Sequence, residues 1–480
     1  MKNPGENNPG GENIPFIVFI TVVAALGGFL FGFDSGVING AVTAISAEFK
    51  SASVGTGFNV ASMLLGCVAG AVCSGWMADR FGRKPVMLLM SLMFLFGAWG
   101  SGIAGGSLEF VLYRLVGGFG VGAASAICPV YICEIAPARI RGMLASAQQM
   151  AIVSGLFCAF LSNYIIAELS GGAQNVSWLG FKAWQWMFWM GIPPALLFFA
   201  GLALIPESPR FLVGAGRLER AKSVLSKIFG GGTDAEIAEI KNSMDSRKPS
   251  FKDLLKKGSF NFRTIVWIGM AVAAFQQITG INIIFYYGEV LWRSVGVDET
   301  RALEQNVASG AVNIVGTVVA ILLIDRVGRR PLLIAGGAMM ALALAGMSFV
   351  FSFADFENGS MVLPAHMASL AFAFAICYVF GFCASWGPAV WVLLGEMFPN
   401  SMRASAIAVC AATVWVSNFA VTMTFPVMLE SLGLPFTYAT YAFFAFASVV
   451  FVWRFVGETR CVKLEDMRGG EDSGSAGRDF

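Results

Sequence analysis

The stretch Asp-Arg-Phe-Gly-Arg-Lys-Pro at residues 79–85 returns as Asp-Arg-Val-Gly-Arg-Arg-Pro at residues 325–331. Each copy lies between long apolar stretches. A second motif, Glu-x-x-Pro-x-x-x-Arg, begins at Glu134 and begins again at Glu396, in the same order along the chain. Ordered repetition of this kind indicates that one unit was duplicated, and internal duplication in a membrane protein is typical of transporters.

The composition places the chain in a lipid bilayer. Apolar residues make up 56% of it and charged residues 13%, whereas a soluble globular domain has about 25% charged residues. Apolar runs of spanning length, at least ~17 residues, occur at 15–37, 57–78, 86–106, 108–131, 143–167, 184–205, 263–287, 307–324, 332–353, 366–394, 403–429 and 436–456. The sequence therefore predicts an all-α membrane protein with twelve transmembrane helices, six in each of two pseudo-symmetric bundles.

Positive charge alternates between the two sides of these runs. The connections between helices 2–3, 4–5, 6–7, 8–9 and 10–11 are rich in Lys and Arg, with eleven such residues between Arg210 and Lys257. The opposite set of connections holds only Lys50, Lys182, Arg293 and Arg301. By the positive-inside rule the first set is cytoplasmic, and so are both termini.

The predicted domains follow from the same pattern. A cytoplasmic tail (1–14) precedes the first six-helix bundle (15–206), a cytoplasmic linker (207–261) joins it to the second bundle (262–456), and a second cytoplasmic tail (457–480) follows. Apolar spacing in the linker predicts helices at 212–229, 235–244 and 251–255. The linker is too short and too polar to bury a core of its own.

Two ionisable residues stand out inside the predicted spans, Asp34 in helix 1 and Arg114 in helix 4. Each would cost ~2.5–3.5 kcal/mol at mid-membrane, so the two should pair or face water. Burial favours the neutral acid and a nearby guanidinium favours the carboxylate. Separation of the pair would therefore favour proton uptake by Asp34, which makes a proton switch the functional hypothesis and a static ion pair the alternative.

Helix 7 carries a group of uncharged hydrogen-bonding side chains: Gln276, Gln277, Asn282, Tyr286 and Tyr287. Carboxamides both donate and accept hydrogen bonds, as a site for a polyol requires. On an unbroken helix these residues would spread over ~220° of the surface. Either one of them points away or the helix unwinds near Gly280. Hydrogen bonding between helices is the alternative role for these amides.

The repeated charged phrases predict a cytoplasmic latch. Gly75 permits close helix approach, and Asp79 and Asp325 can face the positive N-termini of helices 11 and 5. Acidic and basic side chains could pair across the bundles when the cavity opens outward, with a lipid headgroup site as the alternative. The predicted gating residues are Gly75, Asp79, Arg80, Arg83, Glu134, Arg141, Glu207, Arg210, Asp325, Arg326, Arg329, Glu396 and Arg403.

The cysteines, the glycosylation triplets and the single histidine indicate no further functional site. The nine cysteines lack metal or redox spacing and read as small core residues. Asn175 and Asn358 begin glycosylation triplets in predicted outer loops, and His366 should lie at the surface. Nothing resembles a nucleotide loop, metal cluster or nucleophile triad, so we expect no enzyme activity, no cofactor, no metal and no nucleic-acid partner.

With these motifs in place, the chain resembles the sugar porter family of the major facilitator superfamily. The family phrases include Pro-Glu-Ser-Pro-Arg at 206–210, which has a weaker echo at 457–460, and Gln-Gln-Ile-Thr-Gly-Ile-Asn at 276–282. The resemblance extends to bacterial proton-coupled monosaccharide symporters. It implies a secondary carrier, monomeric in the cell membrane, that imports a hexose or pentose with a proton by alternating access. A facilitative uniporter and a non-transporting sugar sensor are the alternatives.

The resemblance also implies further residues of the sugar site. Gln149, Asn313, Trp386 and Trp415 would join the lining, with Trp386 as a stacking plate, although Trp415 and the nearby Asn418 could equally serve helix packing. Two departures stand out. Gln185 and Gly191 occupy places where the family often has an Arg and a Glu, and Gly457 replaces a proline of the last motif.

Overall fold

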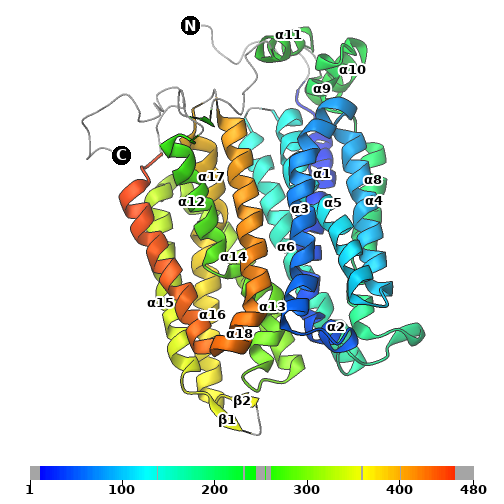
Figure 1. The fold of residues 1–480 in the computed structure, drawn as a ribbon. Helices are drawn as coiled ribbons and strands as arrows, with labels where there is room; N and C mark the ends of the chain where they lie inside the picture. Colours follow the sequence, from blue (N-terminus) through cyan, green and yellow to red (C-terminus); the bar gives the residue numbers. More distant parts are fainter. Residues whose placement is uncertain are drawn as a thin grey trace.

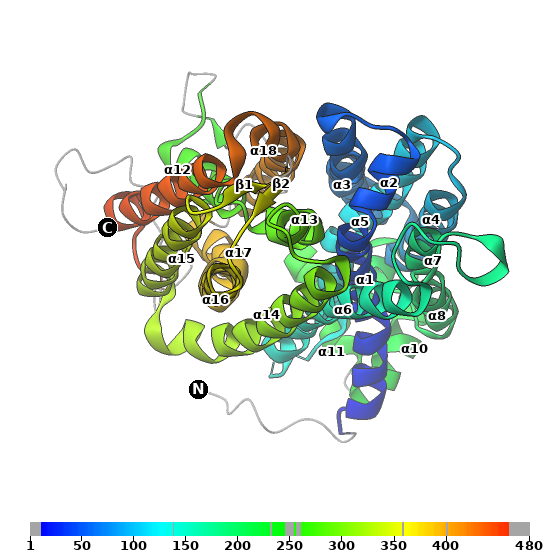
Figure 2. The same cartoon turned by 90° about the horizontal axis from the view of Figure 1, so that it is seen from below.

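The computed structural model describes residues 11–137, 139–230, 233–244, 254–255, 261–357, 360–399 and 402–459. These residues are almost entirely helical, apart from a small antiparallel hairpin of β1 (Asp355–Glu357) and β2 (Ser360–Val362) and two isolated bridges. Two groups of long helices stand side by side (Figures 1 and 2). We call the end that carries α9–α11 the inner end and the end that carries α2 and the β1–β2 hairpin the outer end (Figure 1).

The first bundle and the segment after it consist of α1 (Ile14–Val37), η1 (Ile38–Gly40), α2 (Val42–Glu48), α3 (Ser53–Phe81), α4 (Arg83–Ile103), α5 (Ser107–Ile135), α6 (Arg141–Ser170), η2 (Trp178–Gly180), α7 (Ala183–Trp189), α8 (Ile192–Leu204), α9 (Pro209–Gly214), α10 (Leu218–Phe229) and α11 (Thr233–Met244). The second bundle consists of α12 (Thr264–Ile278), α13 (Ile281–Arg293), α14 (Glu299–Val327), α15 (Arg329–Phe351), α16 (Ala365–Gly381), η4 (Phe382–Trp386), α17 (Gly387–Met397) and α18 (Arg403–Phe455).

Eleven helical segments of the described residues are long and apolar enough to cross a membrane. The last of them contains two spans. Its helix, α18, has 53 residues and bends at Gly433, where φ is 74° and ψ is 172°. Figure 1 shows its two arms meeting at the outer end and diverging toward the inner end. The prediction of twelve spans in an all-α membrane protein is therefore confirmed.

Two predicted spans are interrupted in the middle. The seventh divides at Gly280, which takes the left-handed conformation with φ 87°, so α12 ends and α13 begins there. This is the unwinding that the spread of its amides allowed. The tenth contains the π-helical turn η4, followed by α17 with Pro388 in its first turn. Discontinuous spans of this kind let backbone groups reach a buried site.

Close packing inside the first bundle depends on small residues. A Cβ atom at Gly118 or Gly122 of α5 would overlap the backbone carbonyl of Met63 or Cys67 in α3. Without side chains at these positions, the two backbones approach closely, as is common between membrane helices. This approach fixes α5 against α3 and, with it, the position of Arg114.

The segment after α8 differs from its prediction. Residues 212–229 form two helices, α9 and α10, because Gly216 takes φ 73° between them. The apolar face of α10 is buried at Ala221, Val224, Leu225 and Ile228, and the backbone N–H of Asn13 donates to the carbonyl of Ile228 at 2.9 Å. Most of the helix predicted at 251–255 lies outside the described residues.

The sequence also predicted the positions of the single histidine and of two asparagines in outer loops. His366 is exposed in the first turn of α16, as predicted. Asn175 is exposed, and its side chain donates to the carbonyls of Ser170 and Gly171 at the end of α6. Asn358 lies outside the described residues.

Candidate functional site

Asp34 and Arg114 form an ion pair inside the first bundle. Nη1 of Arg114 donates to Oδ1 of Asp34 at 2.7 Å, and the side chains are 2% (Arg114) and 16% (Asp34) exposed. Nη2 of Arg114 lies 2.9 Å from Sδ of Met63, and the guanidinium sits over the Phe188 ring. The pairing expected from two charges within the membrane is present, because each neutralises the other in a largely apolar surrounding.

One carboxylate oxygen of Asp34 is left over. Its Oδ2 is buried and has no hydrogen-bond partner among the described residues. Gly117 of α5 is the nearby backbone position, since a Cβ added there would lie 3.9 Å from this oxygen. In the Asp34 carboxylate, Oδ1 therefore accepts a hydrogen bond from Arg114, whereas Oδ2 accepts none from the described residues.

The amides of the seventh span form a chain across the Gly280 break. Asn282 Nδ2 donates to Oε1 of Gln277 at 2.6 Å, and Gln277 Nε2 donates to Oε1 of Gln276 at 3.3 Å. Nε2 of Gln276 donates in turn to the carbonyls of Trp386 and Gly387, at 2.9 and 3.2 Å. The break in α12–α13 is thereby joined to the π-helical turn, so both interrupted spans meet at one polar spot.

The other predicted lining residues are found in different settings. Tyr286 is buried, and its hydroxyl lies 3.4 Å from Nδ2 of Asn418. Asn313 is buried on α14, and Gln149 is half-buried on α6. Trp415 of α18 packs on Phe31 of α1 with ring centroids 5.7 Å apart, which brings the two bundles together.

Trp386 and Tyr287 face inward within the second bundle. Trp386 has 0% exposure, and its Nε1 donates to the carbonyl of Leu333 at 2.9 Å. Tyr287 is 1% exposed and donates to the carbonyl of Thr422. The Trp386 ring is therefore fully covered in this conformation, and its stacking role stays a prediction.

The sequence reasoning missed a third buried ionisable group, Glu289. It ended the seventh span at residue 287 and placed Arg293 in an outer loop, whereas α13 continues to Arg293. Glu289 is 2% exposed; its Oε1 accepts from Arg293 at 3.0 Å and its Oε2 accepts from Thr43 Oγ1 at 2.6 Å. The i,i+4 spacing of Glu289 and Arg293 was the available signal, because such a pair neutralises itself on one helix face.

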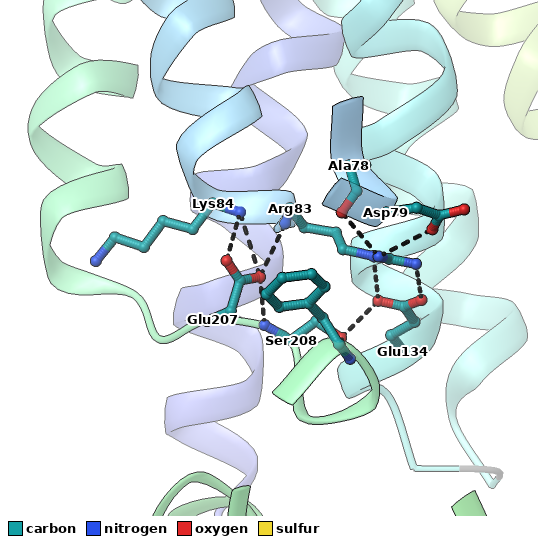
Figure 3. Close-up of polar contacts among 8 residues, drawn as sticks. Ala78, Asp79, Arg83, Lys84, Glu134, Glu207 and Ser208 are labelled. Carbon is teal, nitrogen blue, oxygen red and sulfur yellow. Dashed lines mark hydrogen bonds and ion pairs between the residues drawn. The ribbon is translucent and has the colours of Figure 1, made fainter. Parts of the chain in front are cut away.

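A network of charged and polar side chains ties the inner ends of the first bundle (Figure 3). Arg83 binds both oxygens of Glu134, at 3.0 and 3.1 Å, and Oδ1 of Asp79 at 3.3 Å. The Ser208 hydroxyl donates to Glu134 at 2.5 Å. Because Arg83 begins α4 and Glu134 ends α5, this network fixes neighbouring helix ends within one bundle.

Glu207 closes the start of α4. Its carboxylate accepts from the backbone N–H of Arg83 at 3.0 Å and of Lys84 at 3.2 Å (Figure 3). These groups have no partner within the helix, and the carboxylate also opposes the positive helix end. Burial raises the pKa of Glu207, while its hydrogen bonds from Ser208, Arg83 and Lys84 act in the opposite direction.

The second bundle repeats this arrangement. Nη2 of Arg329 binds Glu396 at 2.8 Å and Asp325 at 3.0 Å, and the Thr459 hydroxyl donates to Glu396 at 2.6 Å. Glu458 accepts from the backbone N–H of Arg329 and of Arg330, each at 3.0 Å, and so caps α15. The replacement of proline by Gly457 leaves this cap intact.

The remaining predicted gating residues are scattered around these two networks. Asp79 and Asp325 are 76% and 79% exposed at the side chain, so each pairs with its own arginine and otherwise faces outward from its bundle. Arg80 and Arg326 are exposed, as is Arg210 in the first turn of α9. Nε of Arg403 donates to the carbonyl of Phe398. The side chain of Arg141 lies outside the described part of the chain.

Contacts between the two bundles gather at the outer end. Asn39 donates to the carbonyls of Ile284 and Phe285, accepts from Asn306 Nδ2 at 2.7 Å, and accepts from the backbone N–H of Glu289 at 3.1 Å. The backbone N–H of Ala173 donates to Glu299 at 2.7 Å. The outer ends of the bundles are therefore held together by polar contacts.

The inner half of α3 is uncovered by comparison. Cys73, Gly75 and Trp76 are exposed there, and a Cβ at Gly75 would meet no atom within 4 Å. The close helix approach expected at Gly75 does not occur in this conformation. The outer ends of the bundles are thus joined, whereas the charged networks of the inner end each lie within one bundle.

These features define a class of protein: a twelve-span membrane protein of two similar bundles with a buried ion pair and a polar break inside the helices. The family model described as sugar (and other) transporter matches residues 20–469 of the chain. The chain belongs to this family, and the resemblance seen in the sequence is confirmed.

Relatives of known type match nearly the whole length of the chain. The chain is 47% identical to a glucose transport protein of Synechocystis sp., over 95% of this chain and 97% of that protein. It is 36% identical to the D-xylose-proton symporter of Escherichia coli K12, over 95% and 96%. The family and these relatives are membrane transporters and not enzymes.

Solved structures agree with the fold. The partially occluded inward-open conformation of the xylose transporter XylE from Escherichia coli matches with a TM-score of 0.80 and 35% identity, over 93% of this chain and 99% of that one. The proton:xylose symporter XylE bound to 6-bromo-6-deoxy-D-glucose matches with a TM-score of 0.76 and 35% identity, over 95% and 99%.

Proposed function

We propose that this protein imports a monosaccharide together with a proton by alternating access across a cell membrane. The observation that carries the proposal is the Asp34–Arg114 ion pair, buried in the first bundle with one carboxylate oxygen unoccupied. Membership of the sugar transporter family supports the substrate class. Relatives described as a D-xylose-proton symporter and an arabinose-proton symporter support the coupling ion.

The proton acts on the ion pair. A proton that binds Oδ2 of Asp34 removes the charge to which Arg114 is paired, and the guanidinium then keeps weaker contacts to Met63, the Asp34 carbonyl and the Phe188 ring. The helices α1 and α5 are no longer held by a charged contact, which lowers the barrier to their relative movement. The membrane potential contributes ~2.3 kcal/mol per charge per 100 mV, enough to concentrate a neutral sugar about 50-fold.

The sugar binds beside the breaks at Gly280 and η4. The carboxamides of Gln276, Gln277 and Asn282 now satisfy one another. A sugar hydroxyl both donates and accepts, so it can replace these bonds one for one without leaving a buried polar group unpaired. Tyr286, Gln149, Asn313, Trp386 and Trp415 complete the proposed site.

The repeated charged networks act as the inner latch. In the present conformation Arg83–Glu134 and Arg329–Glu396 each lie within one bundle. When the outer end opens, the inner ends approach, and the exposed carboxylates of Asp79 and Asp325 meet the positive N-termini of helices in the opposite bundle. The thirteen gating residues predicted from the sequence serve this closure.

The orientation follows from the basic connections. The inner end carries Arg83, Arg329 and the α9–α11 segment, so it faces the cytoplasm, and both termini lie there. The domain limits are 1–14, 15–206, 207–261, 262–456 and 457–480. Each chain contains both bundles and a complete site, so it works as a monomer.

Uptake into proteoliposomes tests the proposal. Radiolabelled D-glucose, D-xylose and L-arabinose are supplied outside, with a proton gradient directed inward. Uphill accumulation of one sugar that a protonophore collapses is expected. Uptake that only equilibrates, with or without the protonophore, would favour a facilitative uniporter. Specific binding without uptake would favour a sensor and overturn the proposal.

A further inference from the structure

A cavity lies at the outer end of the two bundles. It has a volume of about 470 Å³ and is bounded by α2 and α3 of the first bundle and by α13 and α18 of the second. Figure 2, a view of the outer end, shows α2 and α3 facing α13 and α18 across the boundary of the bundles. Pockets of ~300–1,000 Å³ are typical of small-molecule sites.

The residues of its lining that carry a hydroxyl or a carboxylate are Thr43, Ser46, Ser51, Ser53, Thr56, Tyr287 and Glu430. The hydroxyls of Ser46 and Thr56 are hydrogen-bonded at 2.9 Å, and the hydroxyl of Ser51 accepts from Asn59. Val290, Pro426 and Leu429 line it with apolar surface. Rotatable hydroxyls beside an apolar wall suit a molecule that carries hydroxyls around a C–H face.

Two hydrogen bonds of one kind cross between the bundles here. The Ser53 hydroxyl of α3 donates to Oε2 of Glu430 in α18, and the Thr43 hydroxyl of α2 donates to Oε2 of Glu289 in α13. In both, the first bundle supplies an alcohol and the second supplies a carboxylate. A polyol presents the same donor, so it can take the place of a serine or threonine without reducing the number of hydrogen bonds.

We propose that this cavity is an outer vestibule that binds a monosaccharide before it reaches the central site. The proposal rests on the proposed function and adds to it a second, external site. Glu430 accepts from the sugar in place of Ser53, and the released hydroxyl no longer ties α3 to α18. A sugar bound in the vestibule therefore weakens the contact between the outer ends of the two bundles and favours its own entry.

Protection of an introduced cysteine tests the vestibule. Ala47 lines the cavity and is exposed, so Ala47→Cys should react with a membrane-impermeant maleimide applied outside. We expect D-glucose or D-xylose to slow this labelling at least about threefold, while betaine of equal osmolarity does not. Val54→Cys, exposed on the first turn of α3 and not part of the cavity, is the control that sugar should leave unchanged. Labelling of the unmodified protein measures the background from its native cysteines.

Two further variants separate the vestibule from the central site. In the Ala47→Cys background, Glu430→Gln should raise the half-protecting sugar concentration about tenfold, because the hydrogen bond then goes to a neutral acceptor and is weaker. Gln277→Ala should leave protection in place. Absence of protection, or protection that Gln277→Ala abolishes and Glu430→Gln leaves unchanged, would overturn the vestibule. Glu430 is exposed, so its variant tests binding even if Gln277→Ala fails to fold.

Uptake measured on the same preparations keeps the two proposals apart. Sugar uptake without protection of Ala47→Cys rejects only the vestibule. Failure of the unmodified protein to transport any of the three sugars rejects the proposed function, whatever the labelling shows.

Discussion

Asp34 and Arg114 show that a charged residue inside an apolar span predicts a partner of opposite charge. A charge inside a long apolar run is conspicuous, and its high cost in lipid predicts a partner. The structure places that partner 2.7 Å away. Glu289 escaped the same reasoning because it lies near the end of its run, beyond the Gly280 break, where the apolar pattern gives no sharp boundary.

Replacement of Asp34 by Asn tests the coupling role. Asn keeps the size of the side chain but cannot take up a proton. We expect Asp34→Asn to retain exchange of labelled sugar while its accumulation ratio falls to about 1, because no proton movement drives uptake. Counterflow and protonophore-sensitive uptake in proteoliposomes measure the two.

Glu109→Gln is the matched control for this substitution. Glu109 is an exposed acid in the first turn of α5, the helix that carries Arg114, and its carboxylate accepts from the backbone N–H of Gly105. It should leave accumulation unchanged. Uphill accumulation by Asp34→Asn would show that another group binds the coupled proton.

At the scale of the helices, the ends and breaks do most to shape the site. The existence of the spans could be predicted from apolar length alone, and the unwinding at Gly280 from the angular spread of the amides. A break beside Gly387 and Pro388 could also be expected, because a proline cannot donate to the carbonyl four residues earlier, but its form as a π-helical turn could not be predicted. Likewise, repeated motifs predicted paired networks, but not that Glu207 and Glu458 would cap helices.

Gly280 should not tolerate a side chain. Its φ of 87° is strained for other residues, and an added Cβ would lie 2.9 Å from Cγ of Tyr441. We expect Gly280→Ala to lower stability by at least ~1 kcal/mol and to reduce uptake. Thermal denaturation in detergent measures the first. Gly395→Ala is the control, since that helical glycine has open space and gains helix propensity. Equal midpoints for the two variants would contradict this account.

The two caps should contribute alike. Glu207→Ala and Glu458→Ala each remove a carboxylate that accepts from two N–H groups at a helix start, of α4 and α15 respectively. We expect each to cost ~1–2 kcal/mol. Their thermal midpoints should fall by similar amounts. A loss confined to one bundle would mean that the repeated motifs have diverged in role.

For the whole molecule, the conformation is the property that the sequence left open. The motifs predicted which charges could meet but not in which state they would be found. Here the polar contacts across the bundles lie at the outer end, through Asn39, Thr43 and Glu289, and the charged networks of the inner end lie within each bundle. The state is decided by small differences between two packings, which local sequence pattern does not encode.

Glu289 should bias this equilibrium. Glu289→Gln weakens the bond from Thr43, a hydrogen bond to a charged group worth ~1.5–3 kcal/mol, so the outward-open population should rise about tenfold or more. Spin-label distances between the outer ends of α3 and α18 measure it. The control is Glu48→Gln, which breaks an outer ion pair with Lys182 inside the first bundle. An unchanged distance distribution for Glu289→Gln would assign this residue to packing alone.

The carboxylate of Glu207 stands where the first bundle leads into α9, and it grips the opening turn of α4. A displacement of α9–α11 would consequently be transmitted through Glu207 to the first turn of α4. A protein that bound these three short helices would therefore act on the start of α4, and it would restrain the first bundle without contacting the proposed sugar site.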